Sequence, residues 1–178
     1  MVKKVLVITS SLRERGNSNA LANEFAKGAK EAGNSVEVVS LAGKNIAFCR
    51  GCLACQKTLK CVINDDAIQI AEKMKNANVI AFATPIYYYS VCGQLKTMLD
   101  RANPLFASDY KFTDIYLLAS AADDAKSAMD GAVSDITGWA SCFEKCSLKG
   151  VVRGVGATGI GEISKEALDE AHKMGKLA

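Results

Sequence analysis

The segment KVLVITSSLRERGNSN (residues 4–19) decides the fold class of this chain of 178 residues. Its first six residues form a short apolar run that is typical of a buried strand. A polar stretch rich in hydroxyl groups follows, and a helical pattern then begins and extends over residues 19–32. A buried strand, a loop and a helix in this order are the repeating unit of α/β proteins, so the segment predicts that class.

The same alternation of apolar runs and helical patterns continues along the chain. Five strands and five helices predict one domain over residues 1–178, a three-layer α/β domain with a doubly wound, five-stranded parallel sheet. The expected architecture is flavodoxin-like with strand order 2-1-3-4-5, whose ligand crevice lies beyond the carboxyl ends of strands 1, 3 and 4. The further strands are expected at 36–41, 79–84, 115–120 and 148–155, and the further helices at 65–74, 94–102, 125–143 and 164–176.

The composition indicates a globular protein without membrane spans. Hydrophobic residues make up 49% and charged residues 23%, the balance of an ordinary folded domain. The net charge of +3 suits an anionic nucleotide and is far from the charge of a nucleic-acid-binding domain. The N-terminal apolar run is too short for a signal-peptide core, and we expect a cytoplasmic protein. Seven cysteines in a reducing compartment favour metal or redox chemistry over disulfides.

The loop after the first strand has the composition of an anion site. Its hydroxyls, its glycine and the free amide groups of the following helix can surround a phosphate, helped by the helix dipole and by Arg13 or Arg15. No Gly-Lys-Ser/Thr follows, so it is not a P-loop. A plain turn with Ser18 or Asn19 as the helix N-cap is the alternative. The candidate phosphate-binding residues are Ser10, Ser11, Arg13, Asn17, Ser18 and Asn19.

Two segments resemble one known family. The pattern SSxRxxGNSxxL (residues 10–21) is similar to the phosphate loop of the NADPH-dependent FMN reductase family, which has the flavodoxin-like fold. TPIYYYSVCGQLK (84–96) resembles the flavin-ring loop of that family and the helix after it. The likeness covers nearly the whole chain. It implies FMN as the cofactor, a nicotinamide nucleotide, NAD(P)H, as a substrate, and an FMN phosphate held by Ser10, Arg13, Asn17 and Ser18.

The tyrosine-rich loop after the third strand is the expected place of the flavin ring. Pro85 is expected to end strand pairing, and the tyrosines offer flat surfaces on which an isoalloxazine can stack. Exposed amide groups there can bond the flavin edge and tune its electronics. A corner that only packs on a helix or subunit is the alternative. The candidate flavin contacts are Thr84, Pro85, Ile86, Tyr87 and Tyr88, joined by Ser120 and Ala121 after the fourth strand.

Four cysteines form a compact motif, Cys49-x2-Cys52-x2-Cys55-x5-Cys61. Two-residue gaps allow consecutive thiolates to reach one metal centre. The motif resembles that of iron–sulfur flavoproteins, relatives of the reductases that carry a 4Fe-4S cluster near FMN. A zinc site and free or redox-active thiols stay open as alternatives.

The most favoured function is an FMN-dependent oxidoreductase that takes hydride from NAD(P)H and passes electrons to a small-molecule or protein acceptor. An iron–sulfur flavoprotein that receives electrons from a ferredoxin, and a redox-sensing module, are the alternatives. No catalytic side chain is expected, because the cofactor performs the chemistry. The only histidine, His172, is expected on a solvated helix face, and Asp100 and Arg101 are expected to form a local surface pair. The family resemblance implies a homodimer or homotetramer.

Overall fold

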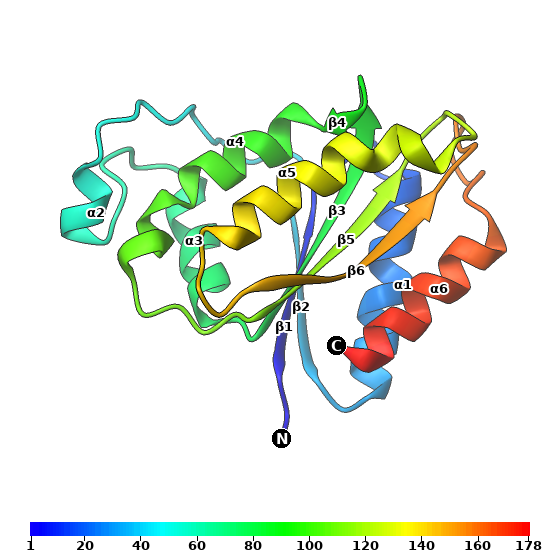
Figure 1. Cartoon of the computed structure of the whole chain (residues 1–178), viewed down its shortest axis with the longest axis horizontal. Coiled ribbons are helices and arrows are strands. Elements are labelled where there is room, and N and C mark those ends of the chain that lie inside the picture. The colour runs from blue at the N-terminus through cyan, green and yellow to red at the C-terminus, as the bar shows by residue number, and fades with distance from the viewer.

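The computed structural model covers residues Met1–Ala178 and contains one central parallel sheet. Its strands are β1 (Lys4–Thr9), β2 (Ser35–Ser40), β3 (Val79–Tyr87), β5 (Asp114–Ser120) and β6 (Ser147–Gly154), in the order β2-β1-β3-β5-β6 (Figure 1). Counted along the chain, this is the predicted order 2-1-3-4-5, which is therefore confirmed. The additional β4 (Ser90–Val91) pairs antiparallel with the end of β3.

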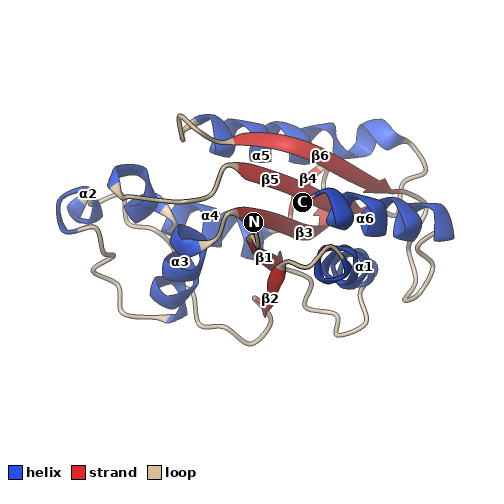
Figure 2. Ribbon diagram, turned by 90° about the horizontal axis from the view of Figure 1, so that it is seen from below, coloured by secondary structure: helices blue, strands red, loops and turns tan.

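Helices cover both faces of the sheet. On one face lie α1 (Asn17–Glu31) and α6 (Lys165–Leu177), and on the other lie α3 (Asp66–Asn76), α4 (Gly93–Arg101) and α5 (Asp130–Ser141), as Figure 2 shows. The short α2 (Ala54–Thr58) lies within the cysteine motif, and two 3-10 turns are η1 (Asn103–Ala107) and η2 (Lys126–Met129). The helix expected at 125–143 is therefore a 3-10 turn followed by a shorter α-helix. No helix combines the length and the apolar character that a bilayer crossing needs.

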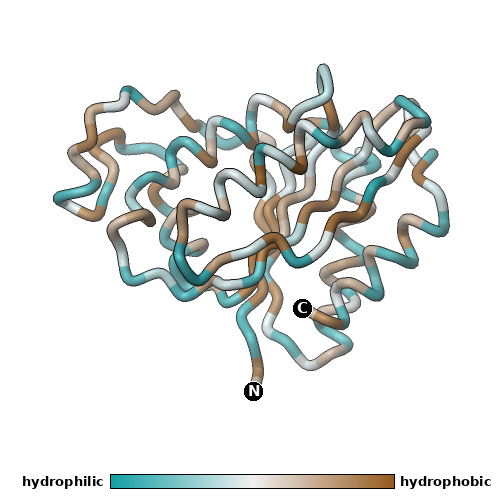
Figure 3. Tube along the Cα trace, in the orientation of Figure 1, coloured by the Kyte–Doolittle hydropathy of each residue, from teal (hydrophilic) through white to brown (hydrophobic).

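The core is divided between the two faces of the sheet. On β1, Val5 and Val7 pack under α1 and α6, whereas Leu6 and Ile8 pack under the helices of the opposite face. Successive strand residues point to opposite faces, and both faces are covered, so the central strands β1, β3 and β5 are apolar over most of their length, whereas the edge strands β2 and β6 are partly exposed. Figure 3 shows this hydrophobic centre along the middle strands.

The close contact of α1 with α6 depends on two glycines. A Cβ on Gly28 would lie only 2.1 Å from the backbone oxygen of His172, and a Cβ on Gly175 only 2.0 Å from that of Phe25. The two helix backbones therefore touch. His172 is not on a freely solvated face as the sequence predicts, because its ring nitrogens lie 3.3 Å from Glu24 and 3.0 Å from Glu31 of α1.

Strand β3 continues past Pro85, which corrects the prediction that this proline ends strand pairing. Ala83 accepts a hydrogen bond from the amide of Ser10 on the β1 side, and Pro85 has the same orientation two residues later. Strand β1 has ended at that point, since its last partner on β3 is Ala83. The missing N–H of Pro85 therefore leaves no ladder partner unsatisfied, and Pro85 pairs in register with Ser120 of β5.

Candidate functional site

A cavity of about 180 Å³ opens at the carboxyl ends of the central strands. It brings together the loop after β1, the end of β3 and the loop after β5, as the sequence predicts for the crevice of this topology. A fourth segment, at the exit of β6, was not assigned to the site. The lining residues are Ser11, Arg13, Gly16, Asn17, Ser18, Pro85, Ile86, Tyr87, Ser120, Ala122, Ala157 and Thr158.

The first turn of α1 supplies unused hydrogen-bond donors to this cavity. The N-cap residue is Gly16, and no side chain caps this helix end. The hydroxyl of Ser18 is buried and has no partner in the chain. A Cβ on Gly16 would lie against the Ser11 hydroxyl and 3.1 Å from the backbone oxygen of Arg13, so a larger residue here would displace the Ser11 side chain. An uncapped helix N-terminus with an unpaired buried hydroxyl is suited to an anion such as a phosphate.

Arg13 and Asn17 also hold the loop between β6 and α6 against the phosphate loop. Arg13 Nη1 donates to the backbone oxygen of Thr158 at 3.2 Å. Asn17 Nδ2 donates to the oxygen of Gly159 at 2.8 Å, and its Oδ1 accepts from the amide of Gly161 at 3.1 Å. These contacts fix the missed fourth wall of the cavity. The glycine-rich composition of 154–161 is the only sequence signal that pointed to it.

Two other candidate phosphate residues are engaged elsewhere. The Ser10 hydroxyl donates to the oxygen of Ala83 at 2.8 Å and lies 3.1 Å from the Cys92 thiol, so it faces the interior between β1 and β3. Asn19 Nδ2 donates to the oxygen of Arg13 at 3.0 Å, which leaves its Oδ1 buried without a partner. Ser10 therefore orders the base of the loop, and Asn19 orders its turn.

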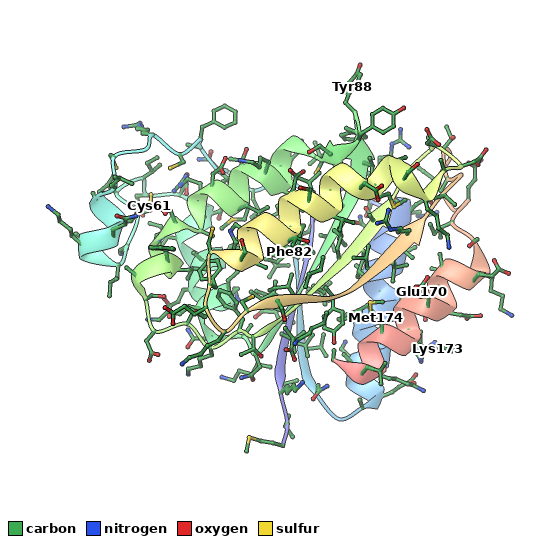
Figure 4. The ribbon with its side chains drawn as sticks, viewed as in Figure 1. Cys61, Phe82, Tyr88, Glu170, Lys173 and Met174 are labelled. Atoms are coloured by element: carbon green, nitrogen blue, oxygen red, sulfur yellow. The ribbon has the colours of Figure 1, made fainter.

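The tyrosine segment forms a tight hairpin turn between β3 and β4. Tyr87 pairs with Ser90, and the two residues between them have left-handed φ angles, 49° for Tyr88 and 65° for Tyr89. Tyr87 lines the cavity. Tyr88 is fully exposed at the tip and projects away from the molecule (Figure 4). Of the predicted tyrosine contacts, the structure places only Tyr87 in the wall of the cavity.

The remaining candidate ring contacts divide into lining and supporting residues. Thr84 is buried, and its Oγ1 accepts from the amide of Cys92 at 3.2 Å. Ser120 and Ala122 line the cavity, whereas Ala121 lies between them and does not. Thr84 and Ala121 thus support the two loops from behind.

The four cysteines of the compact motif do not converge in this structure. Cys49 and Cys52 are exposed, Cys55 is buried and Cys61 is half-buried. No group of three histidine, cysteine, aspartate or glutamate side chains is arranged to hold a metal ion. Four thiols are the donor set of a 4Fe-4S cluster, but their placement here does not fit one. Their assignment as metal ligands stays a prediction.

A buried arginine, Arg101, forms hydrogen bonds with the backbone at both ends of the cysteine segment. Arg101 forms a bidentate ion pair with Asp65, with Nη1–Oδ2 at 2.6 Å and Nη2–Oδ1 at 2.8 Å. Its Nη1 also donates to the oxygen of Ala47, before the first cysteine, and its Nη2 to that of Ile63, after the last. The prediction of a surface pair with Asp100 is wrong, because the Arg101 side chain is 0% exposed. Asp100 pairs with a lysine instead.

The ion pair sets the ionisation of both partners. Burial alone would raise the pKa of Asp65, but hydrogen bonds from Arg101 and from the amides of Ala47 and Ala67 outweigh it and lower that pKa. The hydrogen bond from the Asp65 carboxylate in turn raises the pKa of Arg101. Asp65 is also the N-cap of α3 and accepts a hydrogen bond from the amide of Ala67.

The sheet order together with an uncapped α1 that opens on the crevice defines a flavodoxin-like α/β protein. Residues 3–143 match the model of the NADPH-dependent FMN reductase family. The match covers most of the chain, and the chain belongs to this family. Membership in this family supports the interpretation of the chain as an FMN-dependent oxidoreductase.

The curated relatives carry a narrower name. An iron–sulfur flavoprotein of Methanocaldococcus jannaschii is 40% identical over 102 residues, which are 57% of this chain and 53% of that protein. An iron–sulfur flavoprotein of Methanosarcina thermophila is 34% identical over 99 residues, 56% of this chain and 52% of that protein. The chain thus spans about half the length of these relatives.

A solved structure of the same fold is an azoreductase from Bacillus anthracis. It superposes with a TM-score of 0.76 at 18% identity and covers 99% of this chain and 100% of its own. At this identity the likeness shows the fold.

Proposed function

We propose that this chain is an FMN-dependent oxidoreductase that takes hydride from NAD(P)H and passes electrons to a small-molecule or protein acceptor. The carrying observation is the unpaired, buried hydroxyl of Ser18 at the uncapped start of α1. A buried hydroxyl without a partner is unfavourable in a folded protein, and a phosphate would satisfy it. Family membership makes the phosphate of FMN the fitting ligand.

The residues of the cavity divide the binding task. Ser18 and Ser11, together with the first amide groups of α1, would hold the phosphate. The positive charge of Arg13 would attract the negative charge of the phosphate. Pro85, Ile86 and Tyr87 would lie against the ring. Bound FMN supplies the hydride and electron chemistry. The protein orients it, and no acidic or basic side chain lines the cavity except Arg13.

A flavin titration tests this proposal. The purified chain should quench FMN fluorescence on binding, and anaerobic NADPH or NADH should bleach the bound flavin. Ser18→Ala should weaken FMN binding roughly tenfold or more, because a hydrogen bond to a charged group contributes about 1.5–3 kcal/mol. Binding of riboflavin, which has no phosphate, should not change.

The matched control is Ser134→Ala, an exposed serine on α5 whose hydroxyl makes no hydrogen bond within the chain. If the wild-type protein binds no FMN, the proposal fails. If Ser18→Ala and Ser134→Ala bind FMN equally, the phosphate is not held at α1.

An iron–sulfur flavoprotein with a ferredoxin as electron donor is the second candidate. It is favoured by the compact cysteine motif and by the names of the curated relatives. Cys49, Cys52, Cys55 and Cys61 would have to move together to hold a cluster. Iron and acid-labile sulfide measured on anaerobically purified protein distinguish the candidates: about four irons per chain support this one. Turnover with NAD(P)H that survives Cys52→Ser and Cys55→Ser supports the first.

A further inference from the structure

An acidic side chain of helix α5, Asp135, forms hydrogen bonds with the end of the turn at Tyr88 and Tyr89. The hydroxyl of Ser90 donates to Asp135 Oδ2 at 2.5 Å. The amide of Val91 donates to the same oxygen at 3.4 Å. One carboxylate oxygen thus accepts hydrogen bonds from a side chain and from a backbone amide at the end of the turn. Hydrogen bonds to an ionised acceptor are stronger than those between neutral groups.

A glycine on the same face of α5 receives the other end of the turn. Gly131 lies one helical turn before Asp135, so the two residues share a face. A Cβ on Gly131 would lie 2.2 Å from the backbone oxygen of Tyr89. The backbone of the turn therefore rests directly on the helix, and it does so only because residue 131 has no side chain.

The turn itself has an unfavourable backbone conformation. Tyr88 and Tyr89 both have left-handed φ angles, which side chains other than glycine, asparagine and aspartate rarely adopt. Such residues persist only where the surroundings hold them. Their side chains do not provide this hold, since Tyr88 is fully and Tyr89 63% exposed. The turn is held by the pairing of β3 with β4 and by the contacts with Gly131 and Asp135 of α5.

We infer that Asp135 is a positioning residue for the flavin ring: it holds the turn that places Ile86 and Tyr87 in the wall of the cavity. The inference rests on the proposed function, because it takes the cavity to be the flavin site. Without the carboxylate, the strained turn relaxes and the fraction of molecules with a competent ring site falls. The apparent dissociation constant rises by the inverse of that fraction.

The test compares FMN and riboflavin binding in the full chain by fluorescence titration. Asp135→Ala should weaken both flavins by the same factor, about tenfold, since the ring site and not the phosphate site is affected. Asp135→Asn retains an acceptor oxygen and should restore most of the affinity. Asp169→Ala, at an exposed position on α6, is the matched control and should bind both flavins as the wild type does.

A second variant separates positioning from loss of folding. Gly131→Ala places the better helix former in α5 but pushes the turn away, so flavin binding should weaken while the helix content of the whole chain, measured by circular dichroism, stays that of the wild type. If wild type binds flavin and both Asp135→Ala and Gly131→Ala bind it unchanged, the inference is overturned and the proposed function stands. If Asp135→Ala weakens FMN but not riboflavin, the inference is also overturned. If wild type binds neither flavin, the proposed function fails, and this inference with it.

Discussion

Replacement of Arg101 by methionine should destabilise the protein far more than any surface substitution on α4. The change removes a fully buried guanidinium and leaves the Asp65 carboxylate, 3% exposed, without its counter-charge. Breaking a buried pair by removal of one partner destabilises by about 3–5 kcal/mol. The oxygens of Ala47 and Ile63 lose their donors as well, so the upper part of this range is expected.

The assay is urea unfolding followed by far-ultraviolet circular dichroism under identical flavin conditions. The matched control is Lys96→Met on the same helix, which removes the exposed ion pair with Asp100 and should change the free energy of unfolding by roughly 1 kcal/mol or less. A loss for Arg101→Met no larger than that of Lys96→Met would refute the reasoning. Limited proteolysis should also cleave residues 48–64 faster in Arg101→Met, because both ends of the cysteine segment are released.

The same pair has a pH signature. The pKa of Asp65 is lower in the folded than in the unfolded chain, so the unfolded chain binds the proton more readily. The stabilisation is therefore complete above the unfolded carboxyl pKa, roughly 4, and is lost as the pH falls through the lower folded value. The difference in stability between wild type and Arg101→Met should shrink as the pH falls, first where the unpaired, buried Asp65 of the variant takes up a proton and then below about pH 4, where the wild type loses its own stabilisation. A difference that stays constant down to about pH 3 would contradict this assignment.

The remaining predictions concern packing, thiols and assembly. Gly28→Ala should destabilise the folded protein by about 1–3 kcal/mol, because the added Cβ would meet the backbone oxygen of His172. Gly138→Ala, at a position with open space around it, should stabilise the protein by roughly 0.5–1 kcal/mol. Thermal unfolding measures both effects. Burial raises the pKa of Cys146 to about 12, so mass spectrometry should find it unalkylated by iodoacetamide at pH 8 while the exposed Cys52 reacts; equal labelling would contradict this. Light scattering should report the homodimer or homotetramer that the family resemblance implies, and a monomer would contradict this expectation.

The architecture was predictable because its signals are local. Apolar runs of strand length alternate with helical patterns, and this alternation requires a parallel sheet covered on both faces. Boundaries were less accurate where a neighbour decides them. Pro85 reads as the end of a strand, yet β3 continues because β1 no longer lies beside it. The break in the helix expected at 125–143 likewise has no counterpart in the apolar pattern.

The position of the site was predictable from the sequence, but the hydrogen bonds that build it were not. Ser18, Arg13 and Tyr87 line the cavity that topology places at the carboxyl ends of the strands. The part played by Asn17 in binding the β6–α6 loop, 142 residues away, is not visible in any local pattern. The cysteine spacing suggests convergence, but the thiols lie apart, because spacing limits what a loop can reach and does not determine its conformation.

The sequence by itself determined the class of fold, the order of its elements and three of the loops that meet at the binding edge, since periodicity and strand succession are properties of neighbouring residues. The tertiary structure decided which distant polar groups meet. Asp65 pairs with Arg101 across 36 residues, and Asp135 holds Ser90 across 45. These contacts depend on how α3, α4 and α5 pack on the sheet. Because a buried charge or hydroxyl without a partner is unfavourable, the packing that pairs these groups is the stable one.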